Sequence, residues 1–129
     1  MRTLLTVAFA LSLAACGKGS ILEISCGTDG KLCDVSGSNV CCVGQSSAAC
    51  TTQISCSGAP AFRCVGAELC GSGMHCCVND LESRCAPACQ GAETQACDTN
   101  ADCPSGMTCM TRTYTSTSGA PLFSISLCQ

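Results

Sequence analysis

The stretch that decides the fold is CVGAELCGSGMHCCVNDLESRCAPAC, residues 64–89, which holds six cysteines with an adjacent pair in its middle. Residues 26–56 carry six cysteines in the same order. In both stretches a Val follows the adjacent pair, and seven residues separate that pair from the next cysteine. A shorter third set matches the start of this pattern and consists of Cys97, Cys103, Cys109 and Cys128. The chain therefore contains an internal repeat of about 33 residues, with a truncated final copy.

The composition indicates why so many cysteines are present. The chain has 17 cysteines in 129 residues, and from Cys16 onward Leu, Ile, Val and Phe number only 17 of 114 residues. Such a thin apolar core does not offset the conformational entropy of an ordered chain, so covalent links must contribute. We expect a small disulfide-rich fold with little regular structure, short β-hairpins and about eight disulfides.

The N-terminus has the pattern of an export signal. Met1-Arg2 is followed by an apolar run too short to span a membrane, which ends in Leu13-Ala14-Ala15-Cys16. This ending resembles the lipobox of bacterial lipoproteins, which implies cleavage before Cys16 and acylation of its thiol. An ordinary signal peptide with Cys16 as a free thiol is the alternative. Acylation of Cys16 leaves sixteen cysteines, an even number that closes eight disulfides.

The expected organisation has three parts. Residues 1–15 are the lipoprotein signal peptide, and residues 16–25 are the lipidated cysteine with a short tether. Residues 26–128 are a disulfide-rich region of three cysteine repeats (26–56, 64–89 and 97–128). Gly17 after the lipidated residue resembles lipoproteins that are passed to the outer membrane, so we expect a protein anchored by lipid in the bacterial cell envelope, at the outer membrane or cell surface.

Regular structure is predicted mainly near the C-terminus. Residues 111–116 and 122–127 flank a Ser118–Pro121 turn, and Phe123, Ile125 and Leu127 alternate with serines at the period of a half-buried strand. We expect a terminal hairpin there and no long helix.

Two disulfide patterns fit six cysteines with an adjacent pair. A cystine knot pairs the first with the fourth, the second with the fifth and the third with the sixth, but it would leave Cys97 without a partner because Met110 replaces the fourth cysteine. Pairing the first with the third and the second with the last leaves none unpaired. For the third set this gives Cys97–Cys109 and Cys103–Cys128.

The cysteine spacing from Cys50 to Cys89, with gaps of 5, 7, 5, 5, 0, 7 and 3 residues, is similar to the whey acidic protein, or four-disulfide core, module. The gap from Cys77 to Cys85 is longer than the usual one in that family. The resemblance implies the pairs Cys50–Cys77, Cys56–Cys85, Cys64–Cys76 and Cys70–Cys89, and leaves Cys26, Cys33, Cys41 and Cys42 to pair among themselves. The CDTNADCPSGMTC stretch, residues 97–109, also resembles repeats of cysteine-rich surface lipoproteins of myxobacteria, which is the resemblance we prefer.

The sequence argues against a metal site, a cofactor and nucleic acid. No C-x2-C motif occurs, and an exported chain meets an oxidising compartment, so we expect disulfides and no metal ligands. Met74 and Met107, at equal repeat positions, are expected to pack softly against disulfides. From Cys16 onward five Lys and Arg face nine Asp and Glu, a net charge of −4, which is unsuited to binding phosphates.

Catalysis is not expected. His75 is the only histidine, and Val40 and Thr108 fill its position in the other repeats, which is typical of a spacer before a cysteine. Asp80 and Glu82 are expected to be solvated turn residues. We therefore predict a non-catalytic protein, held at the membrane by its N-terminal lipid, with a role in binding a protein or glycan ligand or in envelope structure.

Two alternatives remain open from the sequence. A protease inhibitor of the four-disulfide-core type would use the loop beside the second cysteine of that module, residues 51–58. A metal-binding cysteine-rich protein would keep free thiols.

Overall fold

The computed structural model describes residues 22–129, so the predicted signal peptide, residues 1–15, and the predicted lipidation site Cys16 lie outside the described residues. The described chain contains short β-strands and three single-turn 3-10 helices, and no longer helix occurs within it. The strands are β1 (Glu23–Ser25), β2 (Leu32–Asp34), β3 (Asn39–Val43), β4 (Ala48–Thr52), β5 (Ala61–Phe62), β6 (His75–Val78), β7 (Ser83–Ala86), β8 (Thr94–Gln95), β9 (Cys109–Thr115) and β10 (Pro121–Cys128). The 3-10 turns are η1 (Ile54–Cys56), η2 (Ala67–Leu69) and η3 (Asn100–Asp102). The expected class, a small disulfide-rich fold of short hairpins, is confirmed.

Each cysteine repeat is built around one antiparallel hairpin, namely β3–β4, β6–β7 and β9–β10. All three hairpins have the same register, because the third cysteine of each repeat lies directly opposite the first cysteine of the returning strand, which is the fifth cysteine in the first two repeats and the last in the third. These opposite residues are Cys41 and Cys50, Cys76 and Cys85, and Cys109 and Cys128. The repeat seen in the sequence is therefore a repeat of backbone structure.

The disulfides follow one pattern in all three repeats. The first cysteine bonds the third, the second bonds the fifth, and the fourth bonds the sixth. The third repeat has Met110 in the fourth position and keeps only the first two bonds. The eight disulfides are Cys26–Cys41, Cys33–Cys50, Cys42–Cys56, Cys64–Cys76, Cys70–Cys85, Cys77–Cys89, Cys97–Cys109 and Cys103–Cys128. No disulfide among them joins two repeats.

Three expected pairs, Cys64–Cys76, Cys97–Cys109 and Cys103–Cys128, are present. The pairs Cys50–Cys77, Cys56–Cys85 and Cys70–Cys89 are wrong, since Cys50 bonds Cys33, Cys56 bonds Cys42 and Cys70 bonds Cys85. The first four cysteines also do not form a closed group, because Cys33 and Cys42 bond later residues of their own repeat.

The physical reason for these corrections is the hairpin. Neighbouring residues of a strand point to opposite faces, so Cys76 and Cys77 in β6 must bond partners on different sides of the sheet. The four-disulfide core resemblance starts at Cys50, which is the fifth cysteine of the first repeat. Two of its pairs, Cys50–Cys77 and Cys56–Cys85, therefore join different repeats, whereas every disulfide of the structure lies within one repeat.

The segments between repeats form short linker strands. β5 pairs antiparallel with β3, and β8 pairs antiparallel with β6, so each adds a third strand to the hairpin that precedes it. Each linker strand also reaches the next hairpin, through bridges between Ala61 and Glu82 and between Ala96 and Leu127. Consecutive repeats are thus joined edge to edge by backbone hydrogen bonds.

One buried hydroxyl fastens the first of these junctions. Ser83, the only buried polar residue of the described chain, accepts hydrogen bonds from the backbone N–H groups of Arg63 and Cys64, at 2.8 and 3.0 Å. It donates in return to the carbonyl oxygen of Cys64. The backbone N–H and C=O groups of this segment, which lies outside the β-strands, obtain hydrogen-bond partners in this way.

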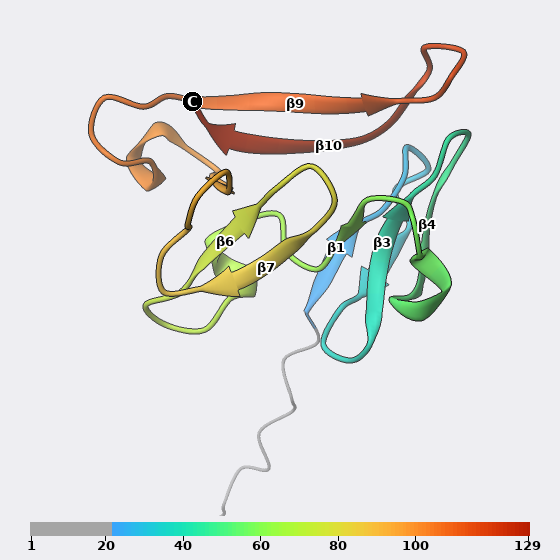
Figure 1. Cartoon of the computed structure of the whole chain (residues 1–129), viewed down its shortest axis with the longest axis horizontal. Helices are drawn as coiled ribbons and strands as arrows, with labels where there is room; N and C mark the ends of the chain where they lie inside the picture. The colour runs from blue at the N-terminus through green and yellow to red at the C-terminus, as the bar shows by residue number, and fades with distance from the viewer. Residues whose placement is uncertain (1–21) are drawn as a thin grey trace, which may run out of the picture.

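The third hairpin is the longest and lies across the other two repeats (Figure 1). The predicted hairpin is confirmed, with strands at Cys109–Thr115 and Pro121–Cys128, so that the first strand begins two residues earlier and ends one residue earlier than predicted. Phe123, Ile125 and Leu127 are buried, as their alternation predicts. The ring of Phe123 stacks on Phe62 of β5 at 4.8 Å between ring centroids, and the ring of Tyr114 meets Phe62 edge-on at 5.2 Å. The three aromatic residues after Cys16 therefore form one cluster under the terminal hairpin.

Candidate binding surfaces

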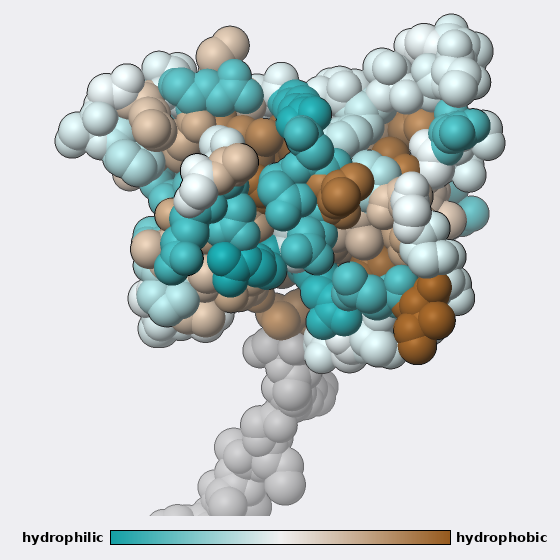
Figure 2. All heavy atoms as spheres, in the orientation of Figure 1, coloured by the Kyte–Doolittle hydropathy of each residue, from teal (hydrophilic) through white to brown (hydrophobic). Residues whose placement is uncertain are grey.

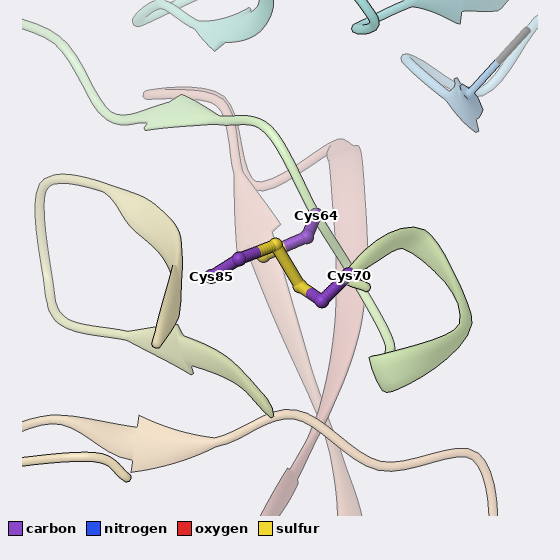
Figure 3. Close-up of side chains that lie close together, drawn as sticks. All are labelled: Cys64, Cys70 and Cys85. Carbon is purple, nitrogen blue, oxygen red and sulfur yellow. A yellow bond between two sulfur atoms is a disulfide. The ribbon is translucent and has the colours of Figure 1, made fainter. Parts of the chain in front are cut away.

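The cysteine clusters of the described chain cannot hold a metal as thiolates. The sulfur atoms of Cys64, Cys70 and Cys85 lie within 4.8 Å of one another, as do those of Cys97, Cys103 and Cys109. Figure 3 shows the first cluster, in which the sulfurs of Cys70 and Cys85 are bonded to each other. Since the thiolate is the form that binds metals, the closeness of these atoms reflects the packing of neighbouring disulfides.

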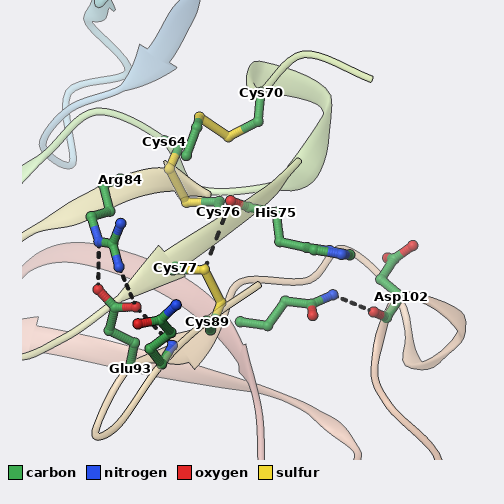
Figure 4. The surroundings of a disulfide bond; sticks show 12 residues. Cys64, Cys70, His75, Cys76, Cys77, Arg84, Cys89, Glu93 and Asp102 are labelled. Carbon is green, nitrogen blue, oxygen red and sulfur yellow. Dashed lines mark hydrogen bonds and ion pairs between the residues drawn. A yellow bond between two sulfur atoms is a disulfide. The ribbon is translucent and has the colours of Figure 1, made fainter. Parts of the chain in front are cut away.

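A hollow of about 370 Å³ lies between the second and third repeats, and His75, Glu93 and Met107 are among its lining residues. Figure 4 shows that the carboxylate of Glu93 points away from His75 and toward Arg84, with which it forms a two-pronged ion pair at 2.6 and 2.9 Å. That guanidinium, followed by the backbone N–H of Gln90, lowers the pKa of Glu93. Glu93 therefore fixes the loop before β8 and is not free to act on a ligand.

His75 itself lies at the start of β6 and faces Ala86 across the hairpin. Its chain neighbours Cys76 and Cys77 are both in disulfides, so neither supplies a nucleophile that the imidazole could activate. Met74 is half-buried, whereas Met107 is 49% exposed and so is packed less closely than the sequence predicted.

The acidic residues of the described chain differ in their surroundings, from exposed ion pairs to partly buried positions between repeats. Asp80 makes an ion pair with Arg112 of β9 at 3.0 Å, whereas its predicted companion Glu82 lies at the bridge to Ala61. Between the second and third repeats, burial followed by the neighbouring Asp98 raises the pKa of Glu68. Backbone N–H groups of Thr99 and Asp98 lower the pKa of Asp102. Asp80 and Asp102 therefore serve a junction and a turn, whereas Glu68 and Asp98 form a pair of neighbouring carboxylates between the second and third repeats.

A second hollow, which we name the Tyr114 cavity, lies between the first repeat and the terminal hairpin. It has a volume of about 330 Å³, and its walls are residues 43–45, 58–60 and 114–117. The hydroxyl oxygen of Tyr114 is buried and has no hydrogen-bond partner within residues 22–129. Burial raises the pKa of this phenol. A buried polar atom without a partner is costly, so a group that reached this oxygen would gain a hydrogen bond, but the wall of the cavity must shift first because the oxygen is inaccessible as it stands.

Sequence reasoning did not find the Tyr114 cavity. Its walls come from three segments that are far apart in the chain, and a hydrogen bond from Thr117 N–H to the carbonyl of Gln45 closes one side at 3.1 Å. The available signal was that Tyr114 is the only tyrosine and lies in a strand whose partner strand is buried. A lone tyrosine opposite a buried strand indicates a residue of the core, but it does not indicate that a cavity lies beside that residue.

The predicted inhibitory loop, residues 51–58, takes part in the repeat itself. Thr51 and Thr52 end β4, and the η1 turn leads to Cys56, which bonds Cys42. Ile54 protrudes with 89% of its surface exposed. The loop therefore lacks the disulfide partner that the four-disulfide core resemblance implied for Cys56.

On the face shown in Figure 2, hydrophobic residues appear as separate small patches among polar and weakly polar ones. Within residues 22–129 no helix is both long and apolar enough to cross a membrane. Comparison of the chain with protein families, curated proteins and solved structures found no match. The geometry of the described residues is therefore the main guide to function.

Proposed function

We propose that this protein is a lipid-anchored protein of the bacterial cell envelope whose disulfide-bonded body has a non-catalytic binding role. One observation carries the proposal. The sixteen cysteines from Cys26 to Cys128 form eight disulfides in three like repeats, whereas the remaining one, Cys16, follows the lipobox-like Leu13-Ala14-Ala15. Complete disulfide pairing is typical of an exported protein, and several acyl chains on one residue give stable membrane attachment.

The anchor is tested on the natively exported protein. Its intact mass should show the loss of residues 1–15 and an added lipid. Reduction should add sixteen hydrogens, which is two for each of the eight disulfides. The Cys16→Ser variant should leave the membrane fraction and keep all eight disulfides. An unacylated N-terminus in membrane-bound material, or several free thiols, would overturn the proposal.

The Tyr114 cavity is the place where the binding role has the best support. Its size is at the lower end of small-molecule sites, its wall includes Val43, Ala59 and Pro60, and the buried hydroxyl of its lining residue Tyr114 has no hydrogen-bond partner within residues 22–129. A compact ligand with an apolar body and one hydrogen-bonding group fits these features. The disulfide frame holds the walls in place before the ligand arrives, which lowers the entropic cost of binding.

Cyclohexanone, an apolar ring with one carbonyl acceptor, is a suitable probe. In an NMR titration the backbone amide signals of Gly44 and Gly58, which line the cavity, should shift. The Tyr114→Phe variant keeps the ring but removes the donor, so it should bind about fivefold more weakly, the effect of one neutral hydrogen bond. Equal binding by both proteins, or shifts confined to other regions, would count against the cavity as the ligand site.

A further inference from the structure

The terminal hairpin differs from the other two in having an unoccupied strand edge. The sheets of the first and second repeats have the orders β4-β3-β5 and β7-β6-β8, so the strand with the adjacent cysteines is always central. The third sheet has only β10 and β9. The outer edge of β9 is therefore the one edge of this type that no strand of residues 22–129 covers.

The register shows which backbone groups lie on that edge. Thr108 and Gln129 exchange two hydrogen bonds at the base of the hairpin, at 2.7 and 2.9 Å. Because bonded and non-bonded pairs alternate along an antiparallel ladder, the N–H and C=O groups of Thr111, Thr113 and Thr115 point outward. The outward N–H of Cys109 is already bonded to the side-chain oxygen of Asn100, at 2.8 Å. The free edge thus runs from Thr111 to Thr115.

Two common protections of a strand edge, a proline and a bulge, are absent from β9. The strand has no proline, and the irregularity in the hairpin lies in β10, between Pro121 and Phe123. Met110 replaces the fourth cysteine, so the disulfide that holds the returning chain beside β3 and β6 in the other repeats is missing here. Figure 1 shows β9 along the outer margin of the molecule, with β10 between it and the other repeats. Exposed edges without such protection are templates for another strand.

We propose that β9 pairs antiparallel with β9 of a second copy of this chain, with Thr113 opposite Thr113. In the first two repeats the equivalent edges, those of β3 and β6, are covered by the antiparallel strands β5 and β8. The edge of β9 is therefore expected to accept an antiparallel strand as well. The pairing forms a continuous four-stranded sheet, β10-β9-β9-β10, with two-fold symmetry. This inference rests on β9 alone and does not depend on the lipid or on the Tyr114 cavity.

Side-chain charges and the available hydrogen-bonding groups favour this register over those centred on Arg112 and Thr111. A two-fold axis at Arg112 would place two guanidinium groups opposite each other, which is unfavourable. An axis at Thr111 would require the Cys109 N–H, which Asn100 already occupies. With the axis at Thr113, Arg112 lies opposite Tyr114 of the second copy, and within one chain this guanidinium already lies 5.0 Å from the Tyr114 ring centre. Thr111 then pairs with Thr115 of the second copy.

A cysteine substitution tests both the pairing and the register in the full exported chain. Directly opposite residues of a bonded pair have Cα atoms about 5.5 Å apart, within the range of a disulfide. Thr113→Cys should therefore give a disulfide-linked dimer under mild oxidation. Thr111→Cys, a matched control on the same face and strand, should remain monomeric because the two copies of this residue lie four positions apart in register. No dimer from Thr113→Cys, or equal dimer from both variants, would overturn the proposal.

Sedimentation velocity of the Cys16→Ser protein provides a second measurement. The protein should show a reversible dimer as its concentration rises to about 1 mM, the range of weak contacts. Thr113→Pro removes an N–H that the hairpin does not use, so it should abolish the dimer, whereas Thr113→Val keeps that N–H and should preserve it. A monomer at all concentrations, or dimers equally stable in both variants, contradicts the pairing. If Thr113→Pro fails to form eight disulfides, the cross-linking comparison decides.

Discussion

The first two repeats and the third one share a hairpin register but are held together by different means. Each of the first two has three disulfides around a short hairpin, with eight residues between the opposite cysteines. The third has two disulfides and a hairpin with eighteen residues between Cys109 and Cys128. Its β10 strand buries Leu122, Phe123, Ile125 and Leu127, far more apolar surface than either shorter hairpin.

The difference shows that cross-links and apolar burial replace each other within one fold. A disulfide that closes a loop of about 15 residues contributes about 3 kcal/mol, and burial of one large apolar side chain contributes about 1.5–3 kcal/mol. Where the fourth-to-sixth bond is lost, the longer hairpin folds over the first two repeats and completes the aromatic cluster with Phe62. The third repeat therefore depends on its neighbours, whereas the first two depend mainly on their own disulfides.

The largest effect is expected from Phe123→Ala, which attacks the burial that holds the third repeat. Removal of this ring from the stack with Phe62 should lower the free energy of unfolding by about 3–5 kcal/mol, measured by urea denaturation with disulfides intact. Thr111→Ala on the exposed side of the same hairpin should change it by less than about 0.5 kcal/mol. Similar values for the two variants would show that burial does not stabilise this repeat.

Removal of the Cys77–Cys89 disulfide tests how much the first two repeats depend on their own cross-links. The double variant Cys77→Ser, Cys89→Ser opens a loop with a sequence separation of 12 residues and should cost about 3 kcal/mol. Hydrogen exchange should rise in β6, β7 and β8 and stay slow in β10. Faster exchange in β10 to the same degree would mean that the repeats unfold as one unit.

Ser83→Ala probes the junction between the first two repeats. It leaves the buried N–H groups of Arg63 and Cys64 without their acceptor and should cost about 1–3 kcal/mol. Ser105→Ala, an exposed serine in the third repeat, is the matched control and should be neutral. An equally neutral Ser83→Ala would show that water replaces this hydroxyl.

The smallest effect is expected from the Glu93–Arg84 ion pair, which holds the loop leading from the second repeat to the third. Because Arg84 lowers the pKa of Glu93, the folded state favours the ionised carboxylate. The stabilisation is present above the ordinary pKa of 4.5 and is lost as the pH falls through the folded value.

Urea midpoints of the natural protein and of Glu93→Gln should therefore differ at about pH 6 and converge toward about pH 3. In an Arg84→Gln background the pH dependence of this difference should shrink. A difference that grows on acidification would contradict the assigned direction.

Much of this fold could be predicted from the spacing of the cysteines and the alternation of one segment. The repeat, the disulfide-rich class and the terminal hairpin followed from residues 64–89 and from Phe123, Ile125 and Leu127. The pairs Cys97–Cys109 and Cys103–Cys128 followed from the third set, because only one of the two repeat patterns considered left none of its cysteines unpaired. These features depend on local sequence, which is why local reasoning found them.

The other pairs were missed because the family resemblance was given more weight than the internal repeat. The third set lacks both the fourth and the sixth cysteine, which already indicates that these two positions bond each other. Applied to Cys42 and Cys77, that rule gives the partners Cys56 and Cys89 that the structure has. The Tyr114 cavity and the free edge of β9 were beyond such reasoning, since both arise from how distant segments pack.

Confinement of every disulfide to its own repeat has a consequence for biogenesis. A chain that crosses a membrane from its N-terminus exposes the cysteines of one repeat before those of the next. Each repeat therefore finds its full set of partners as soon as its last cysteine has emerged, while later thiols are still out of reach. On the proposed export route, with the N-terminus first, the order in which cysteines emerge narrows the choice of disulfide partners, and the repeats can oxidise correctly one after another.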